Sequence, residues 1–396
     1  MRATLNDLMN LELMGSLKLV AGAEGLTNRL GKVGILDFEF TRRGAAQSTD
    51  RYWQPDELIL TTLLYTDGND EMLLDAVKKL HKNGVCGLAV KNVFMLEISR
   101  EVIRYANQNN FPLFVFTDFG LFFEDIIVAA GKLTERFEDY RLGEISLNRL
   151  LRSSPEPKEV KRLALDINSS FKNFFSAVYI RPKHSSAAES LNALLVRGLS
   201  RQDFEAGDAL VKYNQGCFYI HSMDANRQSA LEHARARLSL VPGDFHWGAG
   251  NEQFFLAHFR EALLQAYQAA CYCELYGHES RAYEQIGVYK LLLERQEQGR
   301  HNDYPQTILS AITEHDRENG SELLETLMEY EFRDGNVRET AAALFTHENT
   351  VRYRLKKLAG LFGQEIGNKN FELELLLAVK LRRIQLLLHD GRDIPV

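Results

Sequence analysis

The sequence predicts a multidomain protein with a parallel-sheet α/β domain, an α+β middle domain and an all-α C-terminal domain containing a helix-turn-helix. Three observations support this order. Strand-like apolar runs alternate with helical patterns in the N-terminal part, a hairpin signal lies in the middle, and two amphipathic helices follow near the end. A length of 396 residues allows about two to four domains, and 45% hydrophobic content lets each bury a core.

The N-terminal region alternates apolar runs with helical patterns. A short helix is predicted at Thr4 to Met9, where Thr4 is the N-cap and Asp7 completes a weaker form of the capping box. Gly84 is expected to close the first long helix that follows. The predicted strands are Gly34 to Phe38, Leu58 to Thr62, Val85 to Val90 and Pro112 to Thr117, and the helices are Glu71 to Lys82 and Ile98 to Asn109. This alternation implies a parallel sheet.

Polar side chains follow the predicted strands at their carboxyl ends. They are Asp37, Thr61, Thr62, Lys91 and Asp118. Small molecules bind at this edge of parallel sheets, so these residues are candidates for an effector site. Taken singly, each is more often a capping or turn residue. The chain has no Gly-x-Gly-x-x-Gly or Walker sequence and no zinc-type spacing of Cys and His, so we expect no cofactor and no metal.

A helical connector and an α+β domain are predicted next. The pattern from Phe122 to about Leu151 is helical, and Ser153 to Pro157 interrupts it. Such a helix can be a spacer or the seam of a dimer, and we favour the seam. The predicted strands are Phe174 to Arg181, Ala209 to Tyr213 and Cys217 to Ser222, the last two joined at Asn214-Gln-Gly216. Helices are predicted at Gln228 to Ser239 and Phe254 to Tyr276, separated by Phe245 to Gly250.

The segment from Asn336 to Leu358 contains two short helical patterns joined by a tight turn at Phe345 to His347. The apolar residues repeat at i, i+4 and i+7 in each half, so the two stripes can face each other. These residues are Val337, Ala341 and Leu344 in the first half and Val351, Leu355 and Leu358 in the second. The small Ala341 side chain allows a close helix crossing, as a helix-turn-helix requires.

The outward face of the second helix indicates contact with DNA. Asn349, Tyr353, Lys356 and Lys357 point away from the apolar stripe, and Thr350 and Arg352 flank them. Asparagine can pair with adenine, and lysine and arginine neutralise phosphates or read guanine. An ordinary amphipathic helix with a solvated basic face is the alternative, but the paired stripes and the turn favour the helix-turn-helix.

The same segment resembles the C-terminal domain of the PucR family of bacterial transcriptional regulators. The matching residues are Asn336, Glu339, Thr340, Ala341, Leu344, Phe345, His347, Asn349, Thr350, Tyr353, Arg354 and Leu355. The resemblance implies that the second helix enters the major groove, and it extends the DNA-binding role across His347 to Lys357, including Arg354. The N-terminal region resembles the PucR sensor domain through Leu19 to Gly22, Gly25-Leu26, Val33 to Asp37, Asp56 to Thr62 and Gly84 to Lys91.

The middle region resembles the degenerate GGDEF-like domain of PucR and CdaR regulators. A nucleotide cyclase carries glycines and carboxylates at the hairpin tip, whereas Tyr213-Asn-Gln-Gly216 lacks carboxylates, so we predict no cyclase activity. The resemblance implies four parts. They are an effector-sensing domain at residues 1–125, a helical connector at 126–165, a GGDEF-like domain at 166–285 and a DNA-binding domain at 286–396, with the helix-turn-helix at 336–358.

The resemblance implies a metabolite-responsive regulator of a catabolic operon for purines, amino acids or related nitrogen compounds. Its expected partners are a double-stranded DNA operator, a small-molecule effector and a second copy of the chain in a homodimer or larger homo-oligomer. The net charge of −7 argues against nonspecific nucleic-acid binding by the whole surface. No segment is long and apolar enough to span a membrane, and the four scattered cysteines indicate reduced packing residues, so we expect a cytoplasmic protein.

Two other functions are open at this point. The α/β domain could be an enzyme with a C-terminal protein-interaction helix bundle, but the sequence has no nucleophile elbow and no paired metal-ligand histidines, so we expect no enzymatic activity. The C-terminal helices could also serve only for protein contacts. A DNA footprint on an operator distinguishes the regulator from both.

Overall fold

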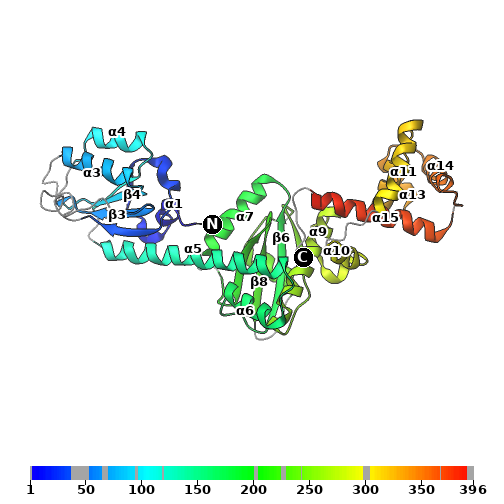
Figure 1. Ribbon diagram of the computed structural model, residues 1–396, viewed down its shortest axis with the longest axis horizontal. Helices are drawn as coiled ribbons and strands as arrows, with labels where there is room; N and C mark the ends of the chain where they lie inside the picture. The colour runs from blue at the N-terminus through cyan, green and yellow to red at the C-terminus, as the bar shows by residue number, and fades with distance from the viewer. Residues whose placement is uncertain are drawn as a thin grey trace. The chain divides into compact units, whose positions relative to one another are not determined.

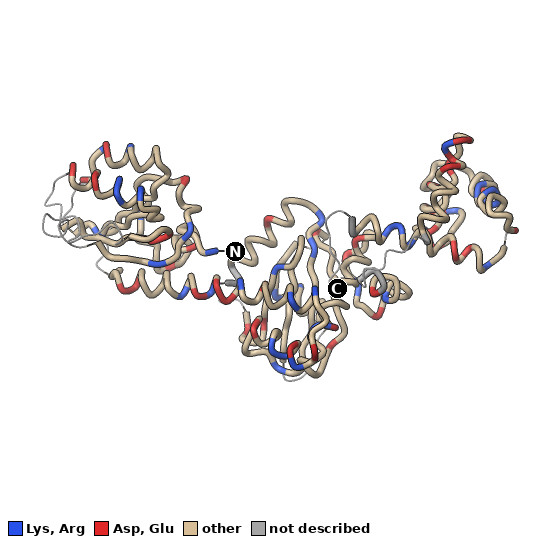
Figure 2. The backbone as a smooth tube through the Cα atoms, in the orientation of Figure 1, with Lys and Arg blue, Asp and Glu red and all other residues tan. Residues whose placement is uncertain are grey.

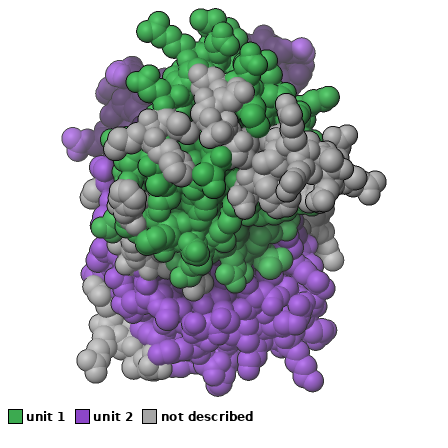
Figure 3. All heavy atoms as spheres, turned by 90° about the vertical axis from the view of Figure 1, so that its left-hand side faces the viewer, with its two compact units in different colours: residues 1–142 green, residues 143–396 purple. Residues whose placement is uncertain are grey.

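The computed structural model describes residues 2–36, 53–64, 70–93, 97–117, 120–199, 204–223, 229–241, 243–297, 304–365 and 367–389. The chain divides into two compact units, residues 1–142 and 143–396 (Figure 3). Each unit contains a five-stranded sheet.

Unit 1 is an α/β domain whose elements follow the predicted alternation. Its elements are α1 (Leu5–Met9), η1 (Glu12–Met14), β1 (Lys18–Ala21), η2 (Ala23–Thr27), β2 (Lys32–Ile35), β3 (Glu57–Thr61), α3 (Asp70–Lys82), β4 (Gly87–Lys91), α4 (Arg100–Gln108), β5 (Leu113–Phe116) and the first part of α5 (Phe123–Arg152). The predicted capping box is present, because Thr4 Oγ1 accepts from Asp7 N and the Asp7 carboxylate accepts from Thr4 N. Gly84 ends α3 with a φ of +77°, a conformation that glycine adopts easily.

The sheet of unit 1 is mixed, not wholly parallel as predicted. Its order is β1-β5-β4-β3-β2, with β2 to β5 parallel and β1 antiparallel to β5 at the edge. The four residues of β1 are too few to show a period of their own in the sequence. The parallel part still brings the carboxyl ends of β2, β3, β4 and β5 to one edge, as the effector-site hypothesis requires.

Helices cover both faces of this sheet (Figure 1). On one face, α3 and α4 pack their apolar residues against β3, β4 and β5 in one hydrophobic cluster. On the other face, α5 contributes a stripe of buried residues. The stripe consists of Ile126, Ala130, Leu133 and Phe137. This apolar stripe of the connector therefore packs within unit 1.

Unit 2 begins with an α+β domain. Its elements are the end of α5, α6 (Pro157–Ile167), β6 (Phe174–Pro182), α7 (Ser185–Leu199), β7 (Asp208–Tyr213), β8 (Gly216–Met223), α8 (Ala230–Leu238), β9 (Phe245–Ala249), η4 (Leu256–His258), α9 (Phe259–Tyr276), β10 (Ser280–Ala282), η5 (Tyr283–Ile286) and α10 (Tyr289–Glu297). The strand order is β10-β9-β6-β8-β7, and only β9 and β10 pair in parallel. The predicted hairpin is present, with Tyr213 paired to Gly216.

Several elements of this domain differ from the sequence prediction, among them α7 and β10, which the sequence did not indicate. Phe245 to Gly250 was expected only to separate two helices, but residues Phe245–Ala249 form β9 beside β6. The strand is buried on both faces, so its sequence lacks the alternation that marks an exposed strand. Helix α6 lies in the predicted connector, yet its Val160 and Leu163 join the hydrophobic core of the middle domain.

The C-terminal helices complete unit 2. They are α11 (Tyr304–Asn319), α12 (Leu323–Phe332), α13 (Val337–Ala343), α14 (Glu348–Leu361) and α15 (Lys369–His389). Helix α15 contributes to two cores. Leu375 and Val379 pack with α11, α12 and α14, whereas Leu381 and Ile384 pack into the core of the middle domain. The same helix therefore stabilises both hydrophobic clusters.

The four cysteines are buried and form no disulfide, in line with their scattered spacing. They are Cys86, Cys217, Cys271 and Cys273. Burial raises the pKa of the Cys273 thiol to about 12, so this side chain stays protonated at neutral pH. No helix within the described ranges is long and apolar enough to cross a lipid bilayer.

A buried carboxylate joins the C-terminal helices to the middle domain. The Glu331 side chain on α12 is 1% exposed. One of its oxygens, Oε1, lies 2.5 Å from Lys380 Nζ and 2.6 Å from the Tyr276 hydroxyl, and Oε2 lies 3.0 Å from Arg383 Nε. Lys380 and Arg383 belong to α15 and Tyr276 ends α9, so one carboxylate links three helices.

We predict that Glu331→Gln destabilises unit 2. The amide keeps the shape of the side chain but leaves two largely buried cations without a counter-charge, which costs about 3 kcal/mol in the free energy of unfolding. Urea denaturation followed by intrinsic fluorescence measures this loss. Glu325→Gln on the exposed side of the same helix is the matched control and should change stability by less than about 0.5 kcal/mol. Equal effects of the two substitutions would contradict the assigned role of Glu331.

Candidate nucleic-acid interface

Helices α13 and α14 form the predicted helix-turn-helix. Both begin at side-chain caps: Asn336 accepts from the backbone N–H groups of Arg338 and Glu339, and His347 Nδ1 accepts from Asn349 N at 3.1 Å. The two apolar stripes face inward as predicted. Ala341 is 3% exposed and Val351 and Leu358 are fully buried, whereas Val337, Leu344 and Leu355 are half-buried. The packing leaves the opposite side of α14 at the surface.

The turn between the helices has an unusual conformation. Phe345 has a φ of +51° and is 98% exposed. A left-handed backbone costs an aromatic residue about 1 to 2 kcal/mol relative to its ordinary conformation. Thr346 N donates to Ala341 O at 2.9 Å and closes the end of α13. The turn is therefore held by backbone bonds and by its packed neighbours, not by burial of the aromatic ring.

Most of the candidate DNA-binding residues line the exposed side of α14. His347, Asn349, Arg352, Tyr353 and Lys356 are exposed, and Tyr353 keeps 63% of its surface free. Two further candidates are half-buried. They are Thr350 and Lys357. Figure 2 marks the basic positions of this helix in blue. This face combines cationic, amide, hydroxyl and aromatic groups, which are the groups that contact phosphates and base edges.

One acidic residue lies on the same helix. Glu348 is the first residue of α14, and its carboxylate lies 3.7 Å from the Arg352 guanidinium across one helical turn. The pair is exposed, so it contributes little to stability and leaves Arg352 able to exchange partners. A carboxylate in the first turn also interacts favourably with the helix dipole.

Arg354 has a different environment from the other candidates. Its guanidinium lies 2.5 Å from the Glu322 carboxylate and 3.1 Å from the Thr326 hydroxyl, both on the neighbouring α12 segment. The side chain is 20% exposed. The resemblance placed Arg354 among the DNA contacts, whereas the structure turns it towards the protein. Glu322 was not indicated by sequence because it lies 32 positions away and carries no motif.

The candidate effector residues divide into two groups. Thr61, Thr62 and Lys91 end the adjacent parallel strands β3 and β4, as predicted, whereas Asp37 and Asp118 lie outside the described residues. Thr61 is buried, and its hydroxyl accepts from Leu63 N at 3.0 Å, which is the turn role weighed as its alternative.

Lys91 is held at this strand edge by contacts within unit 1. Its ammonium donates to Leu121 O at 2.7 Å and lies 4.5 Å from the centre of the Phe122 ring. These contacts connect the end of β4 to the segment just before α5.

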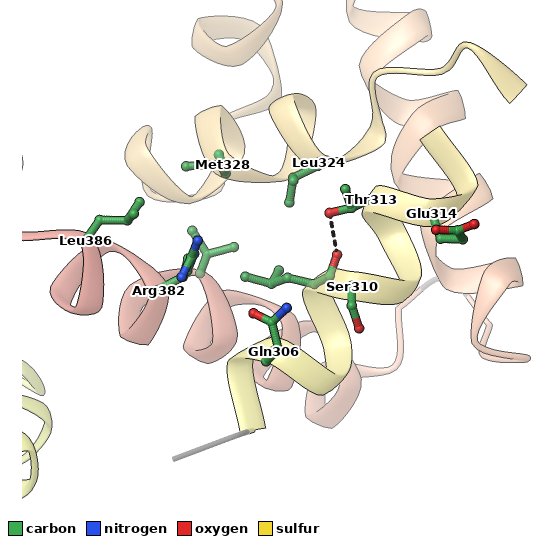
Figure 4. A pocket seen from close by; sticks show the side chains of 10 residues that line it. Gln306, Ser310, Thr313, Glu314, Leu324, Met328, Arg382 and Leu386 are labelled. Atoms are coloured by element: carbon green, nitrogen blue, oxygen red, sulfur yellow. Dashed lines mark hydrogen bonds between the residues drawn. The ribbon is translucent and has the colours of Figure 1, made fainter. Parts of the chain in front are cut away.

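The described part of unit 2 contains hollows that the sequence did not indicate, because each is lined by residues of several elements. A cavity of about 480 Å³ lies between α11, α12 and α15, with Leu324 and Met328 opposite Ser310 and Arg382 (Figure 4). A second hollow of about 610 Å³ opens at the hairpin tip.

The hollow at the hairpin tip is predominantly basic and polar. Its lining includes Lys183 and Lys212. The Glu274 carboxylate lies 2.7 Å from the buried Arg181 guanidinium, and Arg181 also donates to the Gln215 side chain at 3.3 Å. An arginine therefore neutralises this acid, and the tip residues themselves carry no carboxylate.

Two family models match parts of the chain. Residues 7–132 match the purine catabolism regulatory protein-like family, and residues 323–381 match the PucR C-terminal helix-turn-helix domain. The second match contains α13 and α14 with both of their caps. Both models describe regulators and not enzymes, which agrees with the expectation drawn from the sequence.

Characterised relatives also match the chain. It is similar to the proline-responsive transcriptional activator PutR of Bacillus subtilis (strain 168), with 21% identity over 65% of this chain and 66% of PutR. It is also similar to the DNA-binding transcriptional activator AdeR of the same organism, with 31% identity over 26% of this chain and 25% of AdeR. The chain thus spans just under two thirds of the first relative and a quarter of the second.

One solved structure aligns with a large part of the chain. It is the crystal structure of a regulator of polyketide synthase expression from Bifidobacterium adolescentis, with 16% identity, 62% coverage of this chain and 99% of that chain. The TM-score is 0.30, which is too low to support a common arrangement of the whole chains.

We predict that Arg354 and Glu322 stabilise the C-terminal domain as one unit. Arg354→Ala and Glu322→Ala should each lower the free energy of unfolding by about 1 kcal/mol or less, and the double variant should lose no more than the larger single effect. Arg352→Ala is the matched control, because its guanidinium pairs only loosely with an exposed carboxylate. Full additivity of the two single effects would exclude the coupling.

Proposed function

This chain belongs to the PucR family of transcriptional regulators, and from that membership we propose that it controls transcription of a catabolic operon in response to a small metabolite. The exposed face of α14 carries the proposal. Asn349 and Lys356 are exposed on this face, whereas Val351 and Leu358 are buried on the opposite side. One side of the helix is therefore open to solvent while the other packs against the domain. This is the arrangement that a helix needs to enter the major groove.

We propose different roles for the residues of α14. Asn349, in the first turn, reads a base edge, and Arg352 contributes a further base or phosphate contact. Lys356 and Lys357 lie further along the helix and neutralise phosphates. Tyr353 supplies a hydroxyl and a ring on the same face, and His347 and Thr350 lie at its edges. We assign Arg354 to holding α14 on α12, because its guanidinium is engaged by Glu322 and Thr326.

We propose the following division of labour along the chain. Residues 1–125 sense the effector, and residues 286–396 contain the DNA-binding helices. Residues 126–165 form a helical connector, and residues 166–285 form a degenerate GGDEF-like domain without cyclase activity. The second assignment is supported by the antiparallel β6, β7 and β8 and by a hairpin tip without carboxylates. Product formation from GTP and Mg²⁺ by the purified chain would overturn the assignment of an inactive domain.

The effector site is proposed at the carboxyl edge of the unit 1 sheet. Thr61, Thr62 and Lys91 end neighbouring parallel strands there, which supports a site of the kind common in such sheets. Asp37 and Asp118 follow β2 and β5 in sequence and complete the proposed set. The effector is proposed to be a nitrogen-containing metabolite such as a purine or an amino acid, and the proline response in the name of PutR makes L-proline the first probe.

We also propose that the chain acts as a homodimer through the outer face of α5. Val128 and Leu142 are 53% and 51% exposed and lie within an arc of about 40° on the helix. The two residues are two heptads apart with the exposed Glu135 at the position between them, so they would make two separate apolar contacts with a second α5. A dimer would present two copies of α14 to two operator half-sites.

We predict different effects for two substitutions on α14. Lys356→Ala should weaken binding to all DNA sequences and lower the slope of log Kd against log salt by about 1, as expected for the loss of one phosphate contact. Asn349→Ala should instead reduce discrimination at one base pair by about 1 to 3 kcal/mol. Operator fragments with single base changes, titrated at several salt concentrations, measure both effects. Lys161→Ala on α6 removes an equal charge from the middle domain and is the control.

The assignment of α14 depends on the outcome of that titration. Unchanged operator affinity and salt slope in Lys356→Ala would exclude a phosphate contact at this position. Loss of affinity in the Lys161→Ala control would indicate a general effect of charge and not a groove contact.

We predict that an effector changes operator affinity by about 5-fold to 150-fold, the usual range of coupling between two sites. Titration of the full chain with L-proline, other amino acids and purines on a fluorescent operator fragment measures this shift. Thr62→Val should reduce the shift and leave operator affinity without effector unchanged. If no compound in these classes changes operator affinity, the proposed effector class is wrong.

We predict that Leu142→Glu converts a dimer into a monomer, because two carboxylates would be buried against apolar residues at the proposed seam. Sedimentation velocity on the full chain measures the assembly. Lys158→Glu is the control, since it changes an exposed charge on α6, outside the proposed seam. A Leu142→Glu variant that still sediments as a dimer would place the seam elsewhere.

A further inference from the structure

A cluster of potential metal ligands lies in the middle domain at the end of the hairpin opposite its tip. Asp208 begins β7, and His221 on β8 is its direct partner across the hairpin. His233 on α8 lies over the same face of the sheet, where its ring stacks on that of His221. Three separate elements therefore bring a carboxylate and two imidazoles together. The spacing of these residues in the sequence does not reveal that they are close in space.

The geometry of the cluster is compact. One potential ligand atom from each residue lies within 4.8 Å of the others. Asp208 Oδ1 and His221 Nδ1 are 2.5 Å apart, and the two imidazole rings are centred 4.0 Å apart at an interplanar angle of 28°. The side chain of Asp208 is fully buried and that of His221 is 7% exposed. Water therefore has little access to two of the three ligands.

The third potential ligand, His233, has a buried ring nitrogen without a partner in the described part of the chain. His233 Nε2 is buried, and no described residue forms a hydrogen bond with it. A buried polar atom without a partner costs free energy, so it usually binds a water molecule or an ion. In a neutral imidazole, one ring nitrogen carries a lone pair that can bind a metal ion.

The charges around the cluster also suit a cation. Asp208 Oδ2 accepts a hydrogen bond from Glu205 N at 3.0 Å, and Asp208 Oδ1 lies 2.5 Å from His221 Nδ1. Arg237 Nε lies 3.5 Å from Asp208 Oδ2 and also pairs with Glu205. The carboxylates of Asp208 and Glu205 and the guanidinium of Arg237 sum to a formal charge of −1, which a divalent ion would reverse to +1.

We propose that Asp208, His221 and His233 bind a zinc ion. Two imidazoles and one carboxylate match zinc, whereas magnesium and calcium prefer oxygen ligands. Zinc bonds to nitrogen and oxygen are about 2.0 to 2.2 Å long, so the half-buried His233 side chain closes the site by turning towards the other two ligands. The ion ties α8 to the β7–β8 hairpin and satisfies His233 Nε2. The fourth position is left for water.

Zinc binding to the full untagged chain tests this proposal. The protein is stripped with a chelator, and zinc is titrated by calorimetry while bound metal is counted by mass spectrometry. We expect one zinc per chain, no competition from magnesium or calcium, and a cobalt-substituted form with the absorption bands of a four-coordinate site. His233→Ala and Asp208→Asn should each weaken zinc binding at least 10-fold.

Controls keep the experiment decisive. His258→Ala removes an exposed imidazole that lies 3.4 Å from the Glu261 carboxylate, and it should leave zinc binding unchanged. Circular dichroism establishes whether each variant is folded. If one of the two ligand variants does not fold, the other still tests the proposal. Zinc binding of the same stoichiometry and affinity in a folded His233→Ala variant, or no zinc binding by the parent chain, would overturn the proposal.

Discussion

The buried carboxylate of Glu331 is the constraint on which the C-terminal half of the protein depends. A charge with 1% of its side chain exposed is tolerated only when cations and hydroxyl donors surround it, and Lys380, Arg383 and Tyr276 do so. Because these partners come from two other helices, the carboxylate specifies how α12 meets α15 and α9. Burial and the neighbouring Tyr289 raise the pKa of Tyr276, so this hydroxyl stays a donor.

The same region explains how the helix-turn-helix is held while one of its faces stays free. Helix α15 shares its apolar residues between the C-terminal core and the core of the middle domain. Arg354 attaches α14 to α12, and Val351 and Leu358 pack beneath it. Inward contacts thus use the apolar residues and one arginine, and the other polar residues of α14 need no partner inside the protein. A small change in the packing of α12 or α15 is therefore able to alter the presentation of α14.

Regulation in such a protein requires a ligand that binds two states with different affinity. The contacts of Lys91 suggest where such a difference can begin, because its ammonium joins the end of β4 to Leu121 at the start of the long helix α5. Helix α5 buries one stripe against the sheet of unit 1, and its last turns, with Leu147 and Leu151, belong to the core of the middle domain. One helix thus contributes to the packing of both units.

Local signals in the sequence determined much of this protein. The capping box at Thr4, the glycine that ends α3, the hairpin at Asn214 and the paired stripes of α13 and α14 all depend on residues a few positions apart, and each was predictable. The exposed side of α14 followed from helical periodicity alone. Strand β9 did not, because a strand buried on both faces has no alternation to detect.

Only the tertiary structure decided which polar groups face the protein and which face solvent. Arg354 and Lys356 are two residues apart on one helix, yet the first binds Glu322 and the second is exposed. The link between Glu331 and α15, and the meeting of Asp208 with His221 and His233, join residues far apart in the chain. Periodicity assigns a residue to a face of its own helix or strand, but the partner on the opposing element is selected by packing across the whole domain.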